Sequence, residues 1–186
     1  MTMRPTEMLE NEHEFIQKVV AAAMTMADRL AEGITLETDM LQSIVEFMRT
    51  YADKCHHGKE EDLLFPALAK RGVPMRGCPV EALMKEHQMG RALVTNLAEA
   101  IDSYGKGDAA SRDALIKSLR GIVELYPNHI WKEDFLLFPM TNKVLSPEDQ
   151  ASLRQEFEKV EEKLGQGTHH RLEHLAEELA GKLHGV

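Results

Sequence analysis

The stretch TDMLQSIVEFMRTYADKCHHGKEEDLLFPALAK, residues 38–70, decides the fold class. Its apolar residues recur at steps of three and four, which is the spacing of one face of an α-helix. They are Leu41, Ile44, Phe47, Met48 and Tyr51. A helix of this length runs for about 45 Å at 1.5 Å per residue. We therefore expect elongated, roughly antiparallel packing against partners of similar length.

Apolar residues at helical spacing continue through the rest of the chain, where glycines and prolines separate the segments. We expect helices over 6–31, 80–104 and 111–144, one that begins at Ser146 and ends near Gly165, and one over 168–184. No window shows the alternating pattern of a strand with turn residues on both sides. The predicted fold is all-α, an up-down-up-down four-helix bundle over residues 1–145 with a helical C-terminal extension over residues 146–186.

Composition excludes several classes of function. The 186 residues carry 22 Lys plus Arg against 31 Asp plus Glu, a net charge of -9, so we expect neither nucleic acid nor a membrane surface as partner. The chain has no apolar run of about 18 residues and no apolar signal core near Met1, which predicts a cytoplasmic protein. Cys55 and Cys78 are too few for a disulfide scaffold and are expected as free thiols.

The chain repeats its polar residues once. The segment 9–13, LENEH, is echoed by 83–87, LMKEH, and His57 with its following acids and Leu-Phe-Pro is echoed from His129. His13 and His87 are 74 positions apart, and His57 and His129 are 72 apart, too long for a solenoid unit. Two helical hairpins related by a pseudo-twofold axis would gather the repeated His and Glu residues around one centre.

That centre has the composition of a metal site. A histidine and a glutamate four residues apart lie on one face of a helix. Buried imidazoles and carboxylates need compensating charge, and two divalent cations would supply it. The candidate metal ligands are His13, His57, Glu61, His87, His129 and Glu133.

Ligand type narrows the choice of metal. Mixed imidazole and carboxylate sites suit iron, manganese or zinc, and the absence of a thiolate argues against structural zinc. We therefore expect two iron ions with an oxo or hydroxo bridge. At about six positions per octahedral iron, this ligand set leaves one exchangeable position on each ion.

The ordered set of histidines and glutamates, with Leu-Phe-Pro after each paired motif, resembles the hemerythrin-like (HHE cation-binding) family over residues ~6 to 144. The resemblance implies an up-down-up-down bundle that holds a non-heme di-iron centre. The chain is more similar to the four-His, two-Glu branch, which includes the di-iron domain of the repair-of-iron-centres proteins. Oxygen-carrying hemerythrins have a histidine where this chain has Arg91 and an aspartate where it has Glu133.

A bundle core admits only small ligands, so we expect a diatomic or peroxide ligand. One hypothesis is a di-iron protein that reduces or scavenges O2, peroxide or nitric oxide in stress protection or iron-centre repair. The other is an O2, nitric oxide or iron sensor, carrier or storage module. The sequence leaves open whether the protein is an enzyme. The leucine stripe 172, 175, 179 and 183 is either a cover for the bundle or a homodimer contact.

Neighbouring polar residues are expected to stay outside the centre. On a helical wheel, His56 and Glu60 lie off the ligand face, toward solvent or a helix neighbour. Lys54 is expected to extend into solvent. Tyr126 could either donate a hydrogen bond to a metal-bound ligand or serve as an ordinary core residue. His169, His170 and His174 include a pair at helical spacing of four that could bind metal, and we interpret them as a polar helix start after residues 165–167.

Overall fold

A computed structural model describes residues 3–77, 79–108 and 110–184, so Cys78 lies outside the described residues. The all-α fold is confirmed, since no strand occurs within these ranges. The α-helices are α1 (Pro5–Ala31), α2 (Thr38–Phe47), α3 (Phe65–Lys70), α4 (Val80–Gly105), α5 (Ser111–Lys132), α6 (Phe138–Val144), α7 (Pro147–Leu164) and α8 (Gln166–His184). Three π-helical segments lie between them, η1 (Met48–His57), η2 (Glu60–Leu64) and η3 (Glu133–Leu137).

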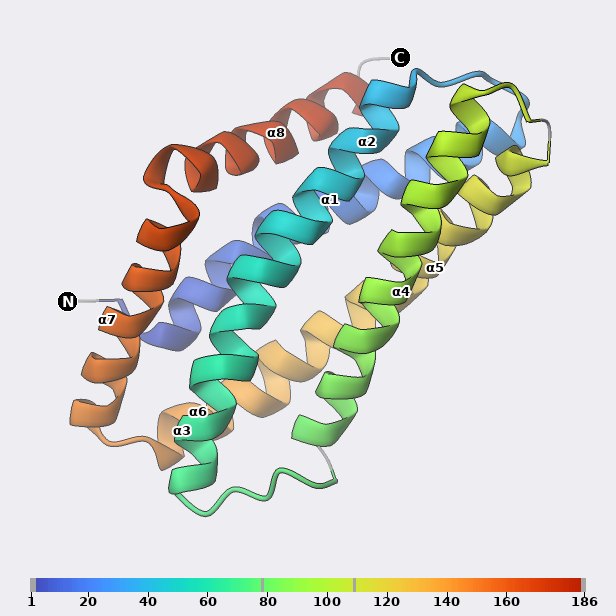
Figure 1. Cartoon of the computed structure of the whole chain (residues 1–186). Coiled ribbons are helices and arrows are strands. Elements are labelled where there is room, and N and C mark those ends of the chain that lie inside the picture. Colours follow the sequence, from blue (N-terminus) through green and yellow to red (C-terminus); the bar gives the residue numbers. More distant parts are fainter. Residues whose placement is uncertain (1–2, 78, 109, 185–186) are drawn as a thin grey trace.

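Four long helices form the bundle. They are α1, the helical run from α2 to α3, α4, and the run from α5 to α6, and their direction alternates along the chain (Figure 1). Helix α5 packs against both α1 and α4, and α2 packs against α4. The bundle therefore has the predicted up-down-up-down arrangement.

The π-helical segments precede the two Leu-Phe-Pro motifs. Pro66 and Pro139 fall in the first turns of α3 and α6, directly after η2 and η3. A proline has no N–H group, and its ring crowds the carbonyl four residues earlier. A π turn places the hydrogen bond five residues back and widens the backbone at that point. Both helices thus continue through their prolines and end a few residues later, at Lys70 and Val144.

The hydrophobic core is divided into two clusters by a polar layer. Leu9 of α1 belongs to one cluster and Ile16 to the other, and His13 lies between them in sequence. On α4, Leu83 and Val94 belong to different clusters in the same way, with His87 between them. The polar residues of the repeat thus lie in the middle of the bundle, with apolar packing on both sides.

The C-terminal helices cover one side of the bundle. Helices α7 and α8 lie beside α1 and the α2–α3 run, away from α4 and α5 (Figure 1). The side chains of Phe157, Leu172 and Ala176 are fully buried, and Leu179 is nearly so. The leucine stripe therefore packs on the bundle, although the side chain of Leu183 lies outside the described part. A homodimer contact through these helices stays a prediction.

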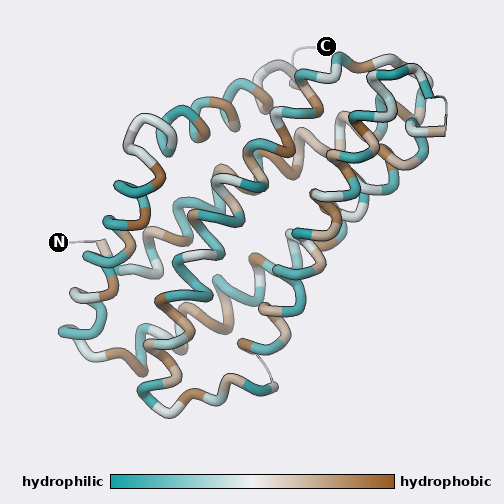
Figure 2. The backbone as a smooth tube through the Cα atoms, viewed as in Figure 1, coloured by the Kyte–Doolittle hydropathy of each residue, from teal (hydrophilic) through white to brown (hydrophobic). Residues whose placement is uncertain are grey.

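Hydrophobic and hydrophilic residues alternate along each helix (Figure 2). Such a pattern is typical of helices with one face buried in a core and one face in water. Within the described part of the chain, no helix combines the length and the apolar character needed to cross a membrane.

Replacing Phe157 by alanine tests how tightly α7 is joined to the bundle. Because this ring is fully buried, the cavity left behind should lower the free energy of unfolding by about 3–5 kcal/mol. Phe135→Ala is the matched control, since Phe135 is 64% exposed and should change stability by no more than about 0.5 kcal/mol. Denaturant unfolding of both variants gives the comparison, and equal effects would contradict this packing.

Candidate metal centre

Six buried ligand-bearing side chains from all four long helices meet in the polar layer. None of these residues is more than 3% exposed as a whole. They are His13 of α1, His56 of η1, Glu60 of η2, His87 of α4, His129 of α5 and Glu133 of η3. Groups of three among them have ligand atoms within 4.8 Å of one another, as a metal ion requires.

The carboxylate of Glu133 connects histidines on two sides of the layer. Its Oε2 lies 3.1 Å from Nε2 of His13. Its Oε1 lies 3.2 Å from Nε2 of His129 and 3.6 Å from Nε2 of His87. Oε2 of Glu133 therefore faces one imidazole, and Oε1 faces two. This is the arrangement expected of a carboxylate that bridges two ions.

Glu60 spans the same two sides from the opposite hairpin. Its Oε2 lies 3.4 Å from Nε2 of His87 and 3.8 Å from Nε2 of His56. The Nε2 atoms of His13 and His56 are 3.0 Å apart, a distance that requires a proton or a cation between them. The layer thus contains one pair of imidazoles, His13 with His56, and a second pair, His87 with His129, with both glutamates between the pairs.

Each of the four imidazoles is held through Nδ1 by its own carboxylate. The pairs are His13 with Asp134 (2.7 Å), His56 with Glu12 (3.0 Å), His87 with Glu61 (2.6 Å) and His129 with Glu86 (3.0 Å). A carboxylate at Nδ1 accepts the ring proton and leaves the lone pair of Nε2 directed at the centre. This support of metal-binding histidines is a general feature of metal sites.

The support repeats with the pseudo-twofold symmetry of the chain. Glu12-His13 on α1 matches Glu86-His87 on α4, and the acid at 61 matches Asp134. The acid that follows the central glutamate of one hairpin holds the histidine on the first long helix of the other hairpin. The repeat in the sequence therefore includes both the histidines and glutamates of the central group and the carboxylates that hold the histidines.

Of the residues predicted as ligands, the structure brings His13, His87, His129 and Glu133 together. Glu61 does not join the central group, because its Oε1 accepts from Nδ1 of His87 and, at 2.8 Å, from Nη2 of Arg91. Metal ligation by any member of the predicted set stays a prediction. The geometry places Glu61 behind His87.

His57 lies beside the central group. Its nitrogens and those of His87 and His129 fall within 4.8 Å of one another, close enough to hold a cation. Its ring, however, stacks on that of His87 with centroids 3.8 Å apart and planes at 14°. An imidazole binds metal with a lone pair in its ring plane, so two nearly parallel stacked rings do not direct their lone pairs at one ion.

His56 and Glu60 do not face solvent, because both side chains are almost completely buried in the polar layer. A signal for their position was present in the sequence. Pro66 and Pro139 are 73 positions apart, and this offset pairs His56 with His129 and Glu60 with Glu133. Pairing His57 with His129 requires an offset of 72, which differs by one residue from the offset of 73 between the two Leu-Phe-Pro motifs.

Unpartnered buried atoms are concentrated in this layer. They include both carboxylate oxygens of Glu60 and Glu133 and the Nε2 atoms of His87 and His129. Buried polar atoms without partners are rare in folded proteins because each costs the loss of its hydration. The atoms are oxygens and imidazole nitrogens aimed at common points, so the residues fit a pair of divalent cations.

The pKa values of the two neighbouring glutamates are shifted in opposite directions. Burial and the neighbouring Glu133 carboxylate raise the pKa of Glu60 well above its usual range. Burial also acts to raise the pKa of Glu133, but the facing imidazoles of His129 and His13 hold it well below its usual range. In the metal-free protein these opposite shifts favour the protonated form of Glu60 beside an ionised Glu133, and two bound cations would favour the carboxylate form of both.

A second buried ion network lies behind His56. Lys59 is fully buried, and its Nζ lies 2.5 Å from Oε1 of Glu12 and 2.5 Å from Oε1 of Glu161 on α7. His169 of α8 approaches the same Glu12 oxygen at 3.3 Å. The interpretation of His169 as an ordinary polar residue at a helix start missed this contact. Lys54 is exposed, as predicted.

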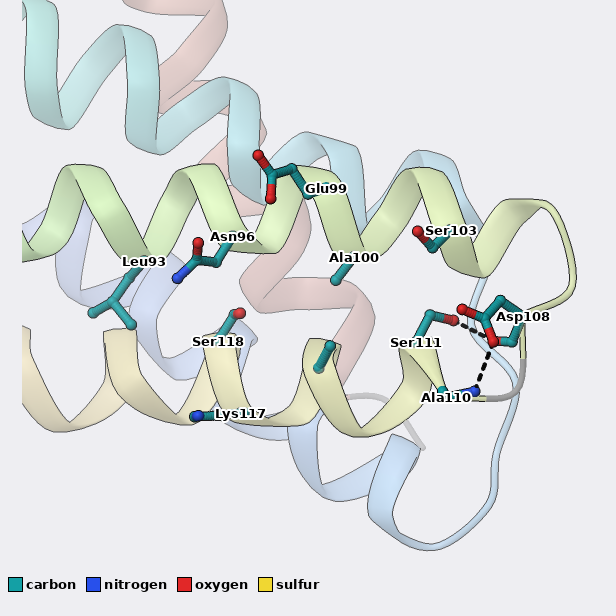
Figure 3. Close-up of a pocket in the computed structure, with 11 residues that line it drawn as sticks. Leu93, Asn96, Glu99, Ala100, Ser103, Asp108, Ala110, Ser111, Lys117 and Ser118 are labelled. Carbon is teal, nitrogen blue, oxygen red and sulfur yellow. Dashed lines mark hydrogen bonds between the residues drawn. The ribbon is translucent and has the colours of Figure 1, made fainter.

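A separate hollow of about 430 Å³ lies between α4 and α5 beside Asp108, Ala110 and Ser111. Figure 3 shows Ala100, Ser111 and Ser118 lining it, with Asp108 accepting a hydrogen bond from the backbone of Ala110. No member of the central histidine and glutamate group lines this hollow. It is therefore not the opening to the polar layer.

Residues 4–141 match the Hemerythrin HHE cation binding domain, so the chain belongs to this family. Among curated proteins, it is 24% identical over 155 residues to Uncharacterized protein Mb2018 of Mycobacterium bovis and to Uncharacterized protein Rv1995 of Mycobacterium tuberculosis. The matched region covers 83% of this chain and 60% of each relative. No solved structure gives a significant match.

Glutamine substitutions at adjacent positions distinguish the two candidate carboxylates. Glu60→Gln removes a charge from the central group and should weaken iron binding by more than about 100-fold, whereas Glu61→Gln removes only support for His87 and should cost about tenfold. Competition against a chelator of known affinity measures both. Loss of iron from Glu61→Gln with retention by Glu60→Gln would restore Glu61 as the ligand.

The pH dependence of the metal-free protein tests the burial of Glu60. A carboxyl whose pKa is raised by folding contributes its stability fully below its unfolded pKa, and this contribution is lost as the pH rises through the folded pKa. Above about pH 4.5, metal-free wild type should therefore lose up to about 1.4 kcal/mol per pH unit relative to Glu60→Gln. Denaturant unfolding across pH measures the difference, and parallel curves would contradict the raised pKa.

Proposed function

We propose that the chain binds two iron ions through His13, His56, Glu60, His87, His129 and Glu133. The single observation that carries this proposal is the set of four imidazoles, each held at Nδ1 by a carboxylate, around two glutamates with unpartnered oxygens. Two imidazoles per ion and two bridging carboxylates make a mixed nitrogen and oxygen set suited to iron. The buried thiol of Cys55 is not part of this set.

The proposed activity is the reduction or scavenging of a small oxidant, namely O2, peroxide or nitric oxide, in stress protection or iron-centre repair. Bound iron would supply redox and Lewis-acid chemistry. The residues of the chain would fix the imidazoles, keep bulk water out of the layer and leave room only for small molecules. This reading is supported by the almost complete burial of all six candidate ligands.

A sensor or carrier function is the second candidate, and one contact favours it. Glu12 holds Nδ1 of His56 and also binds Lys59, which binds Glu161 of α7. A change in the position of His56 on binding a ligand would therefore reach α7 through the ion pairs of the buried Lys59. Such a connection would let the C-terminal helices report the state of the site to a partner. A cytoplasmic location is part of both proposals.

Iron loading tests the proposed centre. Wild-type protein treated anaerobically with ferrous iron should retain about two equivalents after desalting, because two bridging carboxylates and four imidazoles suffice for two ions. Bound iron should also raise the melting temperature, and chelation should reverse the gain. Elemental analysis and thermal unfolding give both readings. Protein that stays metal-free would overturn the proposal.

Turnover separates the two candidate functions in the loaded protein. Peroxide or nitric oxide consumption well above that of free iron at the same concentration supports the scavenging function. A stable adduct with slow further reaction supports the sensor or carrier. Each experiment includes Glu60→Gln as the site-deficient control, because this variant should fold but bind little iron.

A further inference from the structure

A cavity of about 250 Å³ lies next to the polar layer, and its wall includes His57, whose ring stacks on that of His87. Side chains from the η1 segment, α4 and α5 line it. Among them are Met48, Asp53, His57, Gly90, Arg91 and Tyr126. The cavity thus extends from the ring of His57, which lies next to the candidate centre, to the space between η1 and α4.

His57 gives this cavity an imidazole whose Nε2 atom has no hydrogen-bond partner within the described residues. The side chain is 2% exposed, and neither ring nitrogen makes a hydrogen bond within the described part of the chain. Its Nδ1 faces Asp53 Oδ1 at 3.4 Å, which leaves Nε2 free. Burial of an imidazole nitrogen without a hydrogen bond costs free energy unless a ligand or a water molecule supplies the bond.

Asp53 and Arg91, two charged residues that line the cavity, are paired with each other. Arg91 donates from Nε to Asp53 and from Nη2 to Glu61, each at 2.8 Å. Its guanidinium therefore serves as part of the wall, and the remaining cation, Arg49, is exposed at the outer end. Because Met48, Gly90 and the Tyr126 ring complete the inner wall, the cavity suits a small uncharged molecule better than an anion.

The backbone at Gly90 keeps the cavity open. A Cβ atom at this position would lie 3.2 Å from the hydroxyl oxygen of Tyr126, which is closer than ordinary packing allows. A larger side chain would extend into the space between α4 and Tyr126. The absence of a side chain at position 90 thus leaves space beside Tyr126 in the wall of the cavity.

We propose that this cavity is the pocket in which a small uncharged ligand reaches the His87 and His129 side of the centre, with His57 as its hydrogen-bonding partner. The inference rests on the proposed function and assigns His57 to positioning the ligand. His57 would contact the ligand from the side of the polar layer on which Arg91 lies. The size of the cavity admits molecules of a few atoms, such as O2, nitric oxide or hydrogen peroxide.

Xenon tests the cavity without any metal. A crystal of the wild-type protein under xenon pressure should show a xenon atom between Met48, Gly90 and Tyr126, because xenon enters apolar cavities that are open to it. Gly90→Val should abolish this peak by filling the space. Gly181→Val is the matched control, since a Cβ at Gly181 meets no atom within 4 Å. An empty cavity in the wild type would overturn the proposal.

Nitric oxide association tests the pocket in iron-loaded protein. Gly90→Val should keep its iron and slow association by about tenfold, because entry would require displacement of packed side chains. His57→Phe should also keep about two equivalents of iron, and loss of one hydrogen bond should speed nitric oxide release about fivefold. Stopped-flow absorbance and elemental analysis measure these quantities, with Gly181→Val expected to match the wild type.

The outcomes separate this inference from the proposed function. Wild-type protein that takes up no iron overturns both. Wild type and Gly90→Val with full iron and equal nitric oxide association rates overturn the pocket alone. Loss of one iron equivalent from His57→Phe shows that His57 is a metal ligand and overturns its assignment to the pocket.

Discussion

The burial of two carboxyl groups next to each other is the constraint on which the rest of this structure depends. Glu60 and Glu133 are fully buried, and their oxygens have no hydrogen-bond partner within the described residues. Two such groups in the middle of an apolar bundle repel each other and lose their hydration. The surrounding imidazoles reduce this cost by facing the carboxylates, and a pair of cations would remove most of it.

The carboxylates that hold the four imidazoles link the four long helices into a closed ring. His13 joins α1 to η3, His129 joins α5 to α4, His87 joins α4 to η2, and His56 joins η1 to α1. Each contact crosses from one helix to the next, so the ring of four returns to its start. The same contacts that orient Nε2 at the centre therefore also fix how the helices sit around it.

The sequence by itself determined the fold class, the helices and the existence of the centre. Apolar spacing of three and four residues requires helices with one buried face, and the boundaries at glycine and proline follow from backbone chemistry. The expected segments agree with the structure to within about two residues, because these local signals are strong. The repeated histidines and acids also pointed to one polar centre, since such groups have few other reasons to lie near apolar stripes.

The tertiary structure decided which residues of the second helical run face that centre; in the sequence, only the 73-residue offset between the two Leu-Phe-Pro motifs pointed to His56 and Glu60. His56 and Glu60 are four residues apart, as are His57 and Glu61, so helical spacing fits both pairs equally well. The π-helical turns of η1 and η2 change the rotation of the backbone there, so an ideal α-helical wheel misplaces both pairs. Contacts from other helices then assign the roles. Arg91 and His87 of α4 hold Glu61 outside, while Glu12 of α1 turns His56 inward, and these contacts depend on packing that no local pattern contains.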